Sequence, residues 1–575
     1  MYRSLFLLAL ARAILGAPLQ EAASSKAVDY VIIGGGPAGF VLVEAISRNA
    51  SKTVVLLEAG PDGINDTGIN TPALYPTLNQ YVWNYTVIPD PGLAGNTPQL
   101  NQGRVFGGGG GVNGMAYCRG SESLFDDWAT ASGNKGLAWK SMLEAFKETS
   151  HYSSEHGVYD DYVNTTAYGN GPIEISRSTG TGTTNFDKPF GQALQSQLSL
   201  PEVDLTDGHG IGVDYGLSNI WTSNRTRSYG RNTFGALAAA RPNVKLLSGA
   251  WAHHIGFSGK TATNVTYLDL KKKVNTTLVA REIIISGGAI NTPKLLLQNG
   301  IGPSSTLNKY KIPVVADIPA VGQNLWDHLF PIVEVKVPDD ILTVWQWADN
   351  ATEKAIAQQQ YAQNHSGPLS WDNGLVYGAF RVPDSVFDGV NGSHYVNLQK
   401  DRPHVLIEYS TVPFFSGVAN QSVVTAWASL VQPEAAGYVS ISSTDFHTDP
   451  VIQSNYYGSP ADKKAIFWAY KKLRAIMSSS ALSSVVETEL YPGPNVQTDD
   501  QIWNAIQQQS FSFHHPMGTV AIGKALDSNW RLKGLKGIRV VDSSAFPYAT
   551  TCHPHASVYA LAVVAARDIV AADHY

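Results

Sequence analysis

Two adjacent histidines stand near the C-terminal end of this 575-residue chain, in the stretch FSFHHPMGTVAIG from Phe511 to Gly523. Because the ordinary pKa of histidine lies near neutrality, its ring can take a proton from a hydroxyl group and release it again. A second pair, His553 and His555, precedes a segment whose helical periodicity predicts a closing helix with an apolar stripe. The members of that stripe are Val558, Leu561, Val564 and Ile569. These histidines are the first candidates for acid–base chemistry.

Other kinds of catalytic site lack their usual patterns. The 15 histidines are scattered, and the adjacent pairs His253–His254 and His514–His515 do not have the one-turn helical spacing of metal ligands. The sequence contains no H-E-x-x-H, C-x-x-C or G-x-S-x-G stretch. We therefore expect neither a metal site nor a serine nucleophile.

The elements that must position these histidines begin with a dinucleotide-binding pattern. The stretch VDYVIIGGGPAGFVLVEAISRNASKTVVLLEAG reads as strand, glycine turn, helix and strand. Gly34, Gly36 and Gly39 form G-x-G-x-x-G, where they should permit the tight turn, the approach of a pyrophosphate and the packing of helix on strand. Glu58 follows at about 20 residues, where a carboxylate accepts hydrogen bonds from an adenosine ribose. The pattern predicts an α/β, Rossmann-like domain.

A second glycine run distinguishes FAD from NAD, which share that fingerprint. The stretch GRVFGGGGGVNGMAYCRGSESLFDDW, from Gly103 to Trp128, could be a flexible loop, but flexible linkers mix glycine with serine and lack embedded aromatic and branched residues. Here Phe106, Val112 and Tyr117 bracket the glycines. We interpret the run as backbone lying close against a flat ligand.

At these residues the sequence resembles the glucose-methanol-choline oxidoreductases, a family of FAD enzymes that act mainly on alcohols. The residues similar to its first signature are Gly103, Arg104, Gly107, Gly108, Gly109, Gly110, Val112, Asn113, Tyr117 and Gly120. Phe106 stands where a branched aliphatic residue or Trp is usual, and glycines replace the common serines. GAINTPKLLLQNGIG resembles the second signature, with Asn299 in place of Ser. VGQNLWDH and VVDSSAFP also resemble family segments, and the matches keep the family's order from about Val28 to Tyr575.

The resemblance implies a discontinuous FAD-binding domain and a second, α+β substrate-binding domain. The FAD domain is expected at residues 27–110, 215–305 and 505–575, and the substrate domain and connecting segments at 111–214 and 306–504. The polar, aromatic and irregular region from Pro338 to Thr498 should carry substrate specificity.

The same resemblance implies the roles of individual residues. Besides the glycine turn and Glu58, the expected FAD contacts are Arg104, Gly108, Asn113, Gly114, Asp542 and His553. The family's catalytic histidine stands in a segment similar to H-P-x-G-T, which matches His515 and leaves His514 one place too early. The second catalytic residue lies six places before a Tyr-Ala pair, which matches His553. His555 competes with it, but Pro554 is well placed as the first helical residue, with His553 at the N-cap.

The resemblance implies oxidation of a primary alcohol to an aldehyde by hydride transfer to FAD. The electron acceptor is expected to be oxygen, giving hydrogen peroxide, while another acceptor, and hence a dehydrogenase, stays open. The histidine pair and the aromatic-rich chain are most similar to the aryl-alcohol oxidase branch. FAD should be non-covalent, because Val112 occupies the place of the histidine that attaches it covalently in some members. Sugar oxidases, natural-product pathway enzymes, redox-silent cyclases or lyases and a flavin-binding glycoprotein without turnover stay open.

The N-terminal segment and the N-glycosylation sequons indicate secretion. MYRSLFLLALARAILGAPLQEAASS has a cation, a short apolar run and small residues, which predicts a signal peptide within residues 1–23 cut between Gly16 and Ala23. N-x-S/T triplets predict N-linked glycans at Asn49, Asn65, Asn84, Asn164, Asn224, Asn264, Asn275, Asn350, Asn364, Asn391 and Asn420. We expect an extracellular or secretory-pathway protein without a membrane span.

Two remaining features concern cysteine and charge. Cys118 and Cys552 are compatible with a disulfide in an oxidising compartment and equally with two buried thiols. The formal net charge of −6 gives no basic surface for a phosphate backbone, so nucleic acid is not an expected partner.

Overall fold

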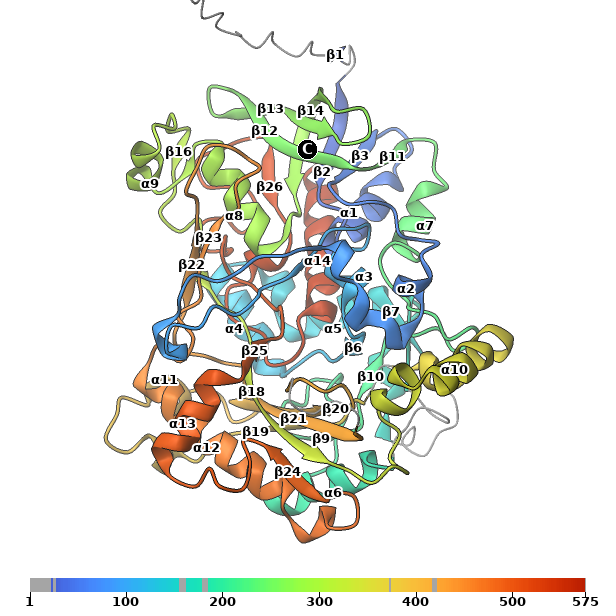
Figure 1. Cartoon of the computed structure of the whole chain (residues 1–575). Helices are drawn as coiled ribbons and strands as arrows, with labels where there is room; N and C mark the ends of the chain where they lie inside the picture. The colour runs from blue at the N-terminus through green and yellow to red at the C-terminus, as the bar shows by residue number, and fades with distance from the viewer. Residues whose placement is uncertain are drawn as a thin grey trace, which may run out of the picture.

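A computed structural model describes residues 27–154, 162–177, 185–371, 374–415 and 421–573, together with the backbone of Ala22 and Ala23 (Figure 1). The predicted signal peptide, apart from those two alanines, and the sequon at Asn420 lie outside the described residues.

The first sheet forms the upper half of the molecule in Figure 1, and its parallel strands run in the order β11-β3-β2-β14. The second half of the long strand β14 pairs in parallel with both β2 and β26, while its first half pairs antiparallel with β13, which in turn pairs with β12. Buried apolar side chains on β2 and β3 allow helices to cover the sheet. The strands are β1 (Ala22–Ala23), which pairs with β14, β2 (Val28–Ile33), β3 (Val54–Glu58), β11 (Val244–Ser248), β12 (Ala250–Ser258), β13 (Thr261–Asp269), β14 (Val274–Ile285) and β26 (Ile538–Val540).

Two helices, α1 (Pro37–Ser47) and α14 (His555–Ala572), pack against each other beside this sheet. In addition, α5 (Trp139–Thr149) contacts α14, and α7 (Phe234–Ala239) contacts α1. Among the described residues, α14 is long and apolar enough to cross a membrane, contrary to our expectation that no segment would be, but most of it is buried inside the protein. Its apolar composition is explained by burial in the core.

The second sheet is antiparallel and lies in the lower half of Figure 1, in the order β24-β18-β21-β20-β19-β9, with β25 also paired to β18. Helix α12 (Pro460–Met477) packs on β21 and β18, and the side chain of Ser459 caps its N-terminus by accepting from the Asp462 N–H. The strands are β9 (Gly212–Asp214), β18 (Leu329–Lys336), β19 (Tyr377–Phe380), β20 (Val405–Ser410), β21 (Val423–Leu430), β24 (Thr488–Tyr491) and β25 (Ser510–Ser512).

Shorter elements connect the two sheets. The remaining helices are α2 (Thr67–Asn70), α3 (Gly109–Val112), α4 (Glu122–Ser132), α6 (Asp187–Leu198), α8 (Gly288–Gln298), α9 (Ser304–Lys309), α10 (Ala351–Asn364), α11 (Ser393–Val396) and α13 (Asp499–Gln508). The remaining strands are β4 (Val82–Trp83), β5 (Gln102–Gly103), β6 (Ala116–Tyr117), β7 (Ser150–Ser153), β8 (Ile173–Ser176), β10 (Leu217–Ser218), β15 (Ile301–Gly302), β16 (Ala316–Asp317), β17 (Gln323–Leu325), β22 (Gly437–Ser440) and β23 (Val451–Gln453).

A mostly parallel sheet covered by helices beside a largely antiparallel second sheet confirms the predicted fold class. The main strands of the first sheet come from three separated stretches, 28–58, 244–285 and 538–540. Strand β25, although it lies in a segment expected for the FAD domain, pairs with β18 of the second sheet. The domain boundaries stay a prediction.

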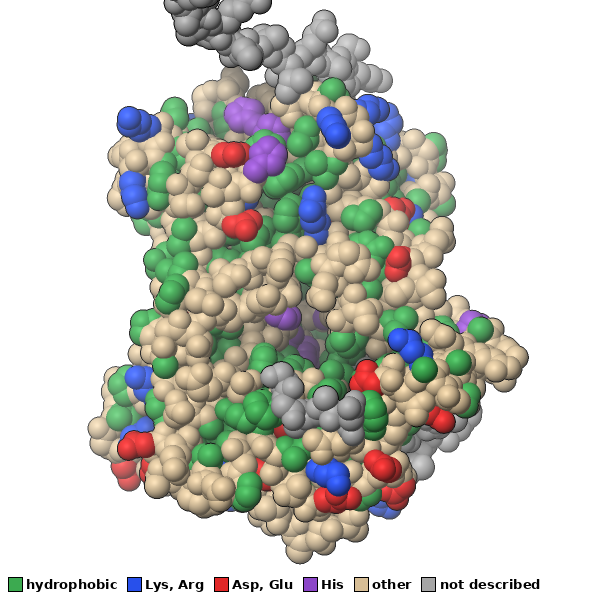
Figure 2. Space-filling view, in the orientation of Figure 1, with side chains coloured by type: hydrophobic (Ala, Val, Ile, Leu, Met, Phe, Trp, Pro, Cys, Tyr) green, Lys and Arg blue, Asp and Glu red, His purple; other side chains and the backbone are tan. Residues whose placement is uncertain are grey.

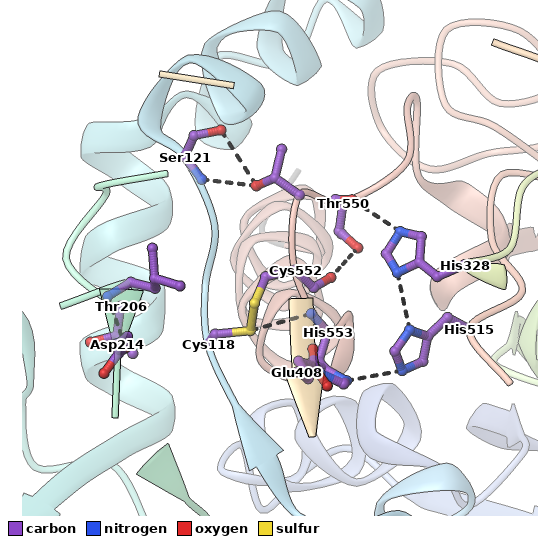
Figure 3. Close-up of a disulfide and its surroundings, with 12 residues drawn as sticks. Cys118, Ser121, Thr206, Asp214, His328, Glu408, His515, Thr550, Cys552 and His553 are labelled. Atoms are coloured by element: carbon purple, nitrogen blue, oxygen red, sulfur yellow. Dashed lines mark hydrogen bonds and ion pairs between the residues drawn. A yellow bond between two sulfur atoms is a disulfide. The ribbon is translucent and has the colours of Figure 1, made fainter. Parts of the chain in front are cut away.

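A disulfide joins Cys118 and Cys552, whose Cα atoms are 6.2 Å apart although 434 residues separate them in sequence. The pairing that the sequence left open is thereby resolved. The bond ties the segment after β6 to the turn that precedes α14 (Figure 3).

Candidate active site

The glycine turn between β2 and α1 has the backbone geometry expected of it. Gly34 has a φ of +110°, and a Cβ there would lie 2.1 Å from the Ser286 carbonyl oxygen. A Cβ at Gly39 would lie 2.0 Å from the Gly34 carbonyl oxygen, so the helix could not close on the strand. At Gly36, by contrast, a Cβ would meet no atom within 4 Å. The turn is tight on its protein side and open at Gly36.

That open side belongs to a cavity of about 620 Å³, lined by residues that extend from the glycine turn and Glu58 to His515 and His553. Figure 2 shows a hollow in the middle of the molecule with histidine side chains in its depth. The second glycine run meets the first here, because a Cβ at Gly108 would lie 2.8 Å from the Gly36 Cα. Two contacting glycine backbones that line one elongated cavity make a cradle that fits FAD.

Glu58 lies at the end of β3 and lines the cavity. Its Oε2 accepts from the Gly35 N–H at 2.9 Å and its Oε1 from the Gly60 N–H at 2.7 Å. Burial raises the pKa of this carboxyl to about 7, while the two backbone donors and Arg104 oppose the rise. Each oxygen keeps a further lone pair, so the predicted contact with a ribose hydroxyl is chemically possible. The Arg104 guanidinium lies 4.4 Å from the ring centre of Trp83, which also lines the cavity.

Asn113 and Gly114 follow helix α3 and line the cavity. The Asn113 side-chain oxygen accepts from Arg227 Nη1 at 2.7 Å and from the Met115 N–H at 3.2 Å. A Cβ at Gly114 would come within 3.4 Å of the Tyr75 ring. The buried Arg227 therefore holds the loop that follows the second glycine run.

Asp542 lies after β26, at the N-terminus of α8. Its Oδ2 accepts from the Gly288 N–H at 2.9 Å and from Thr292 Oγ1 at 2.6 Å, and its Oδ1 accepts from the Ser544 N–H at 2.7 Å. Burial raises the pKa of this carboxyl. Asp542 thus joins the C-terminal segment to the cavity wall. The direct FAD contacts expected of Asn113, Gly114 and Asp542 stay predictions.

His515 and His553 also line this cavity, where their rings meet. His515 Nε2 and His553 Nδ1 are 3.2 Å apart, and His553 Nε2 lies 2.9 Å from Glu408 Oε1 on β20 (Figure 3). Burial, reinforced by the neighbouring histidines, lowers the pKa of His515 well below its ordinary value. His515 is therefore neutral at physiological pH, which is the state that accepts a proton.

The backbone separates the adjacent histidines after β25. The His515 N–H donates to Asp327 Oδ1 at 2.8 Å. His514 has a left-handed φ of 60°, and its Nδ1 accepts from the Asn101 N–H at 3.1 Å. His514 contacts another part of the cavity lining, whereas His515 is the one that reaches His553.

The structure distinguishes His553 from His555. Helix α14 begins at His555 and Pro554 is its N-cap, so our placement of Pro554 as the first helical residue is wrong by one position. The Pro554 carbonyl accepts from the Val558 N–H at 2.9 Å, which opens the helix one residue later. His553 precedes the helix, and its N–H donates to Cys118 Sγ at 3.2 Å.

His555 also lines the cavity, and its ring is buried beside Tyr559 of its own helix. Its ring centre lies 4.7 Å from that of Tyr559, and burial lowers its pKa to about 3. Within the described part of the chain, neither of its ring nitrogens has a hydrogen-bond partner. Only His553 of these two is hydrogen-bonded to His515.

Sequence reasoning missed two residues of this site, Glu408 and His328. Glu408 is a buried carboxylate in the apolar strand VLIEYS, and such a charge within a buried strand needs a partner, which was the available signal. His328 ends the family-like segment VGQNLWDH, to which we assigned no role. Among the described residues there is no group of three or more metal-ligating side chains that could hold an ion.

Aromatic rings form the wall beside the histidine pair. Phe513 is stacked on His515 with ring centres 5.2 Å apart, and Phe330 lies 4.2 Å from Phe513. Trp427 and Phe414, with ring centres 5.7 Å apart, continue this wall, and all four aromatic residues line the cavity. Because they come from β18, β21, the residue after β25 and the loop after β20, no local sequence pattern reveals them.

Comparisons with known proteins agree with this geometry. Residues 28–330 and 433–562 match the N- and C-terminal sequence models described as GMC oxidoreductase. The chain is 30% identical to the glucose-methanol-choline family oxidoreductase mfmG of Annulohypoxylon moriforme, over 95% of this chain and 94% of the relative. It is 28% identical to a patulin synthase of Aspergillus clavatus, over 97% and 94% of the two chains.

Among solved structures, an FAD-dependent oxidoreductase from Chaetomium thermophilum superposes with a TM-score of 0.86 at 25% identity, covering 95% of this chain and 100% of that one. The chain belongs to the GMC oxidoreductase family, a family of FAD oxidoreductases.

Proposed function

We propose that this protein oxidises a primary aromatic alcohol to an aldehyde and passes the electrons to oxygen, giving hydrogen peroxide. The observation that carries the proposal is the pair of histidine nitrogens, His515 Nε2 and His553 Nδ1, 3.2 Å apart at the aromatic end of the cavity. A hydroxyl group that reaches both nitrogens has an acceptor for its proton and a partner that orients its oxygen.

Each residue has a distinct part in this reaction. Neutral His515 takes the hydroxyl proton, and His553, held by Glu408, orients the oxygen. Bound FAD supplies the acceptor for the hydride that leaves the carbinol carbon. The rings of Phe513, Phe330 and Trp427 exclude water from this end of the cavity and offer flat apolar surfaces to an aromatic substrate.

FAD is held without a covalent bond in this proposal. Val112, at the end of α3, lines the cavity and has an aliphatic side chain that cannot attach the cofactor. The residues expected to hold FAD are the glycine cradle, Glu58 and the backbone around Asn113.

The protein is also proposed to be a secreted glycoprotein. Support comes from the exposure of the sequons. Among the sequon asparagines that the structure describes, only Asn264 and Asn275 are half-buried and the others are exposed. An exposed asparagine is accessible to glycosylation.

The test is anaerobic mixing of the FAD-loaded protein with a panel of benzylic, aliphatic and sugar alcohols while flavin absorbance is followed. Bleaching by benzylic alcohols, followed by peroxide release on admission of air, is the expected result. Bleaching by sugars alone would indicate a sugar oxidase instead. If no alcohol bleached the flavin, a redox-silent cyclase or lyase would replace the proposal. The similarity to a patulin synthase makes alcohols of natural-product pathways a useful second panel.

A further inference from the structure

His328 is a buried histidine that directly precedes β18 and contacts His515 from the side opposite His553. Its Nδ1 lies 3.1 Å from His515 Nδ1, and its Nε2 lies 3.1 Å from the Thr550 carbonyl oxygen. In Figure 3, His328, His515 and His553 follow one another, with Thr550 at the first end and Glu408 at the last. His328 is thus the second hydrogen-bond partner of the proposed base.

The position of the proton on His328 follows from the chemistry of its Thr550 partner. A carbonyl oxygen only accepts hydrogen bonds, so the Nε2 of His328 carries a proton and donates it to Thr550. Burial, with a smaller effect from His553, lowers the pKa of His328 to about 3, so its ring is neutral and has no second proton. The Nδ1 of His328 is consequently an acceptor.

That acceptor determines the state of His515. Two ring nitrogens 3.1 Å apart share one proton, and since the Nδ1 of His328 has none, the proton belongs to the Nδ1 of His515. A neutral His515 then has a free lone pair at Nε2, which points to His553 at 3.2 Å. The Nδ1 of His553 faces that lone pair at 3.2 Å, while the Nε2 of His553 carries the proton that it donates to Glu408 Oε1 at 2.9 Å.

The adjacent Asp327 holds the main chain of the same residue. Its Oδ1 accepts from the His515 N–H at 2.8 Å, while its Oδ2 accepts from Ser512 Oγ at 2.6 Å and from the Tyr456 hydroxyl. Asp327 therefore fixes the backbone of His515, while His328 contacts the ring of His515.

We propose that His328 is a positioning residue that holds His515 in the tautomer with its proton on Nδ1, so that the Nε2 atom of His515 is the basic atom of the site. The last residue of the segment VGQNLWDH thereby has a physical role, which is to orient the His515 ring. The tautomer assignment stands on the hydrogen-bond geometry together with the neutrality of the buried His328 ring, and only its kinetic consequence rests on the proposed alcohol oxidation.

The experiment is ¹⁵N NMR of the FAD-loaded protein labelled at its histidine imidazoles. The His515 signals are identified by their loss in His515→Gln. The expected wild-type pattern is a neutral ring protonated at Nδ1. His328→Leu should shift His515 toward protonation at Nε2, whereas His328→Asn, whose side-chain oxygen can still accept from the Nδ1 of His515, should retain the wild-type pattern.

His404 provides the matched control. Like His328 it is a buried histidine whose pKa burial lowers to about 3, with Nε2 bonded to the Tyr395 carbonyl and Nδ1 accepting from the Val382 N–H, each at 3.1 Å. His404→Leu therefore removes a comparable buried ring without touching His515. Its His515 signals should equal those of the wild type.

The kinetic readout is flavin reduction by an alcohol under anaerobic conditions. His328→Leu should slow reduction by about 10²-fold with little change in the half-saturating alcohol concentration, and His328→Asn should recover most of the rate. A wild-type His515 protonated at Nε2, or a folded His328→Leu with unchanged signals and rate, would overturn the proposal. If His328→Leu does not fold, the ¹⁵N signals of His515 in the wild-type protein still test the tautomer. If no alcohol reduces the flavin, the NMR result is unaffected and only the proposed function fails.

Discussion

Replacement of His515 by alanine is the most direct perturbation of the proposed site. The substitution removes the Nε2 atom that lies 3.2 Å from His553 and the ring that lies 3.1 Å from His328. A positioned general base contributes about 10²- to 10⁴-fold to a rate, which corresponds to about 2.7 to 5.4 kcal/mol of activation free energy. We expect flavin reduction by a competent alcohol to slow by that factor.

The same variant should retain FAD, because the hydrogen bonds that hold Glu58 come from the Gly35 and Gly60 backbone and do not involve His515. Its free energy of unfolding should fall, since removal of His515 leaves ring nitrogens of His328 and His553 unpaired at about 1 to 3 kcal/mol each. Flavin absorbance and circular dichroism therefore accompany the kinetic measurement. They separate loss of the base from loss of the fold.

The assay is anaerobic stopped-flow reduction of the bound flavin, with three other variants measured beside it. His553→Ala should also slow reduction, whereas His514→Ala and His555→Ala should not, because neither ring is hydrogen-bonded to His515. A folded, FAD-loaded His515→Ala that is reduced at the wild-type rate would refute the reasoning. A defect in His555→Ala without one in His553→Ala would show that the wrong member of the second pair had been chosen.

Three further outcomes are expected. Acid precipitation should release all yellow colour into the filtrate, since Val112 cannot attach FAD; colour that stays with the polypeptide would contradict this. Protein made in a eukaryotic host should migrate above 61.9 kDa and shift on endoglycosidase treatment, and unchanged mobility would count against glycosylation. Cys118→Ser should lower the free energy of unfolding by about 2 to 5 kcal/mol in a denaturant titration, because it opens the bond to Cys552. Cys118→Ala, which unlike Cys118→Ser leaves no side-chain acceptor for the His553 N–H, should also slow flavin reduction; equal stability and rate would dismiss this role of the disulfide.

Local backbone rules made much of the cofactor region predictable. A glycine is needed at Gly34 because of its positive φ and at Gly39 because a Cβ would collide with the preceding turn. Such requirements act within a few residues, so they are visible in the sequence. Glu58 follows for the same reason, because the length of one helix and one strand sets its distance from the turn.

The family resemblance supplied His515, but the ambiguity between His553 and His555 was not one that local sequence could resolve. The two are separated by one proline, and the choice depends on a helix that starts one residue later than its proline predicts. His553 contacts His515 and Cys118, which are distant along the chain, whereas His555 is not hydrogen-bonded to His515, and the catalytic role of His553 stays a prediction.

What the sequence alone determined about this protein is its fold class, its family resemblance and the positions whose backbone must be glycine. Tertiary structure alone decided which side chains meet: it paired Cys118 with Cys552, brought Glu408 to His553 and placed His328 behind His515. The physical reason is the sequence distance over which each effect acts, because strand and helix propensities depend on neighbouring residues. A hydrogen bond between β20 and the turn before α14 depends instead on how whole sheets and helices pack.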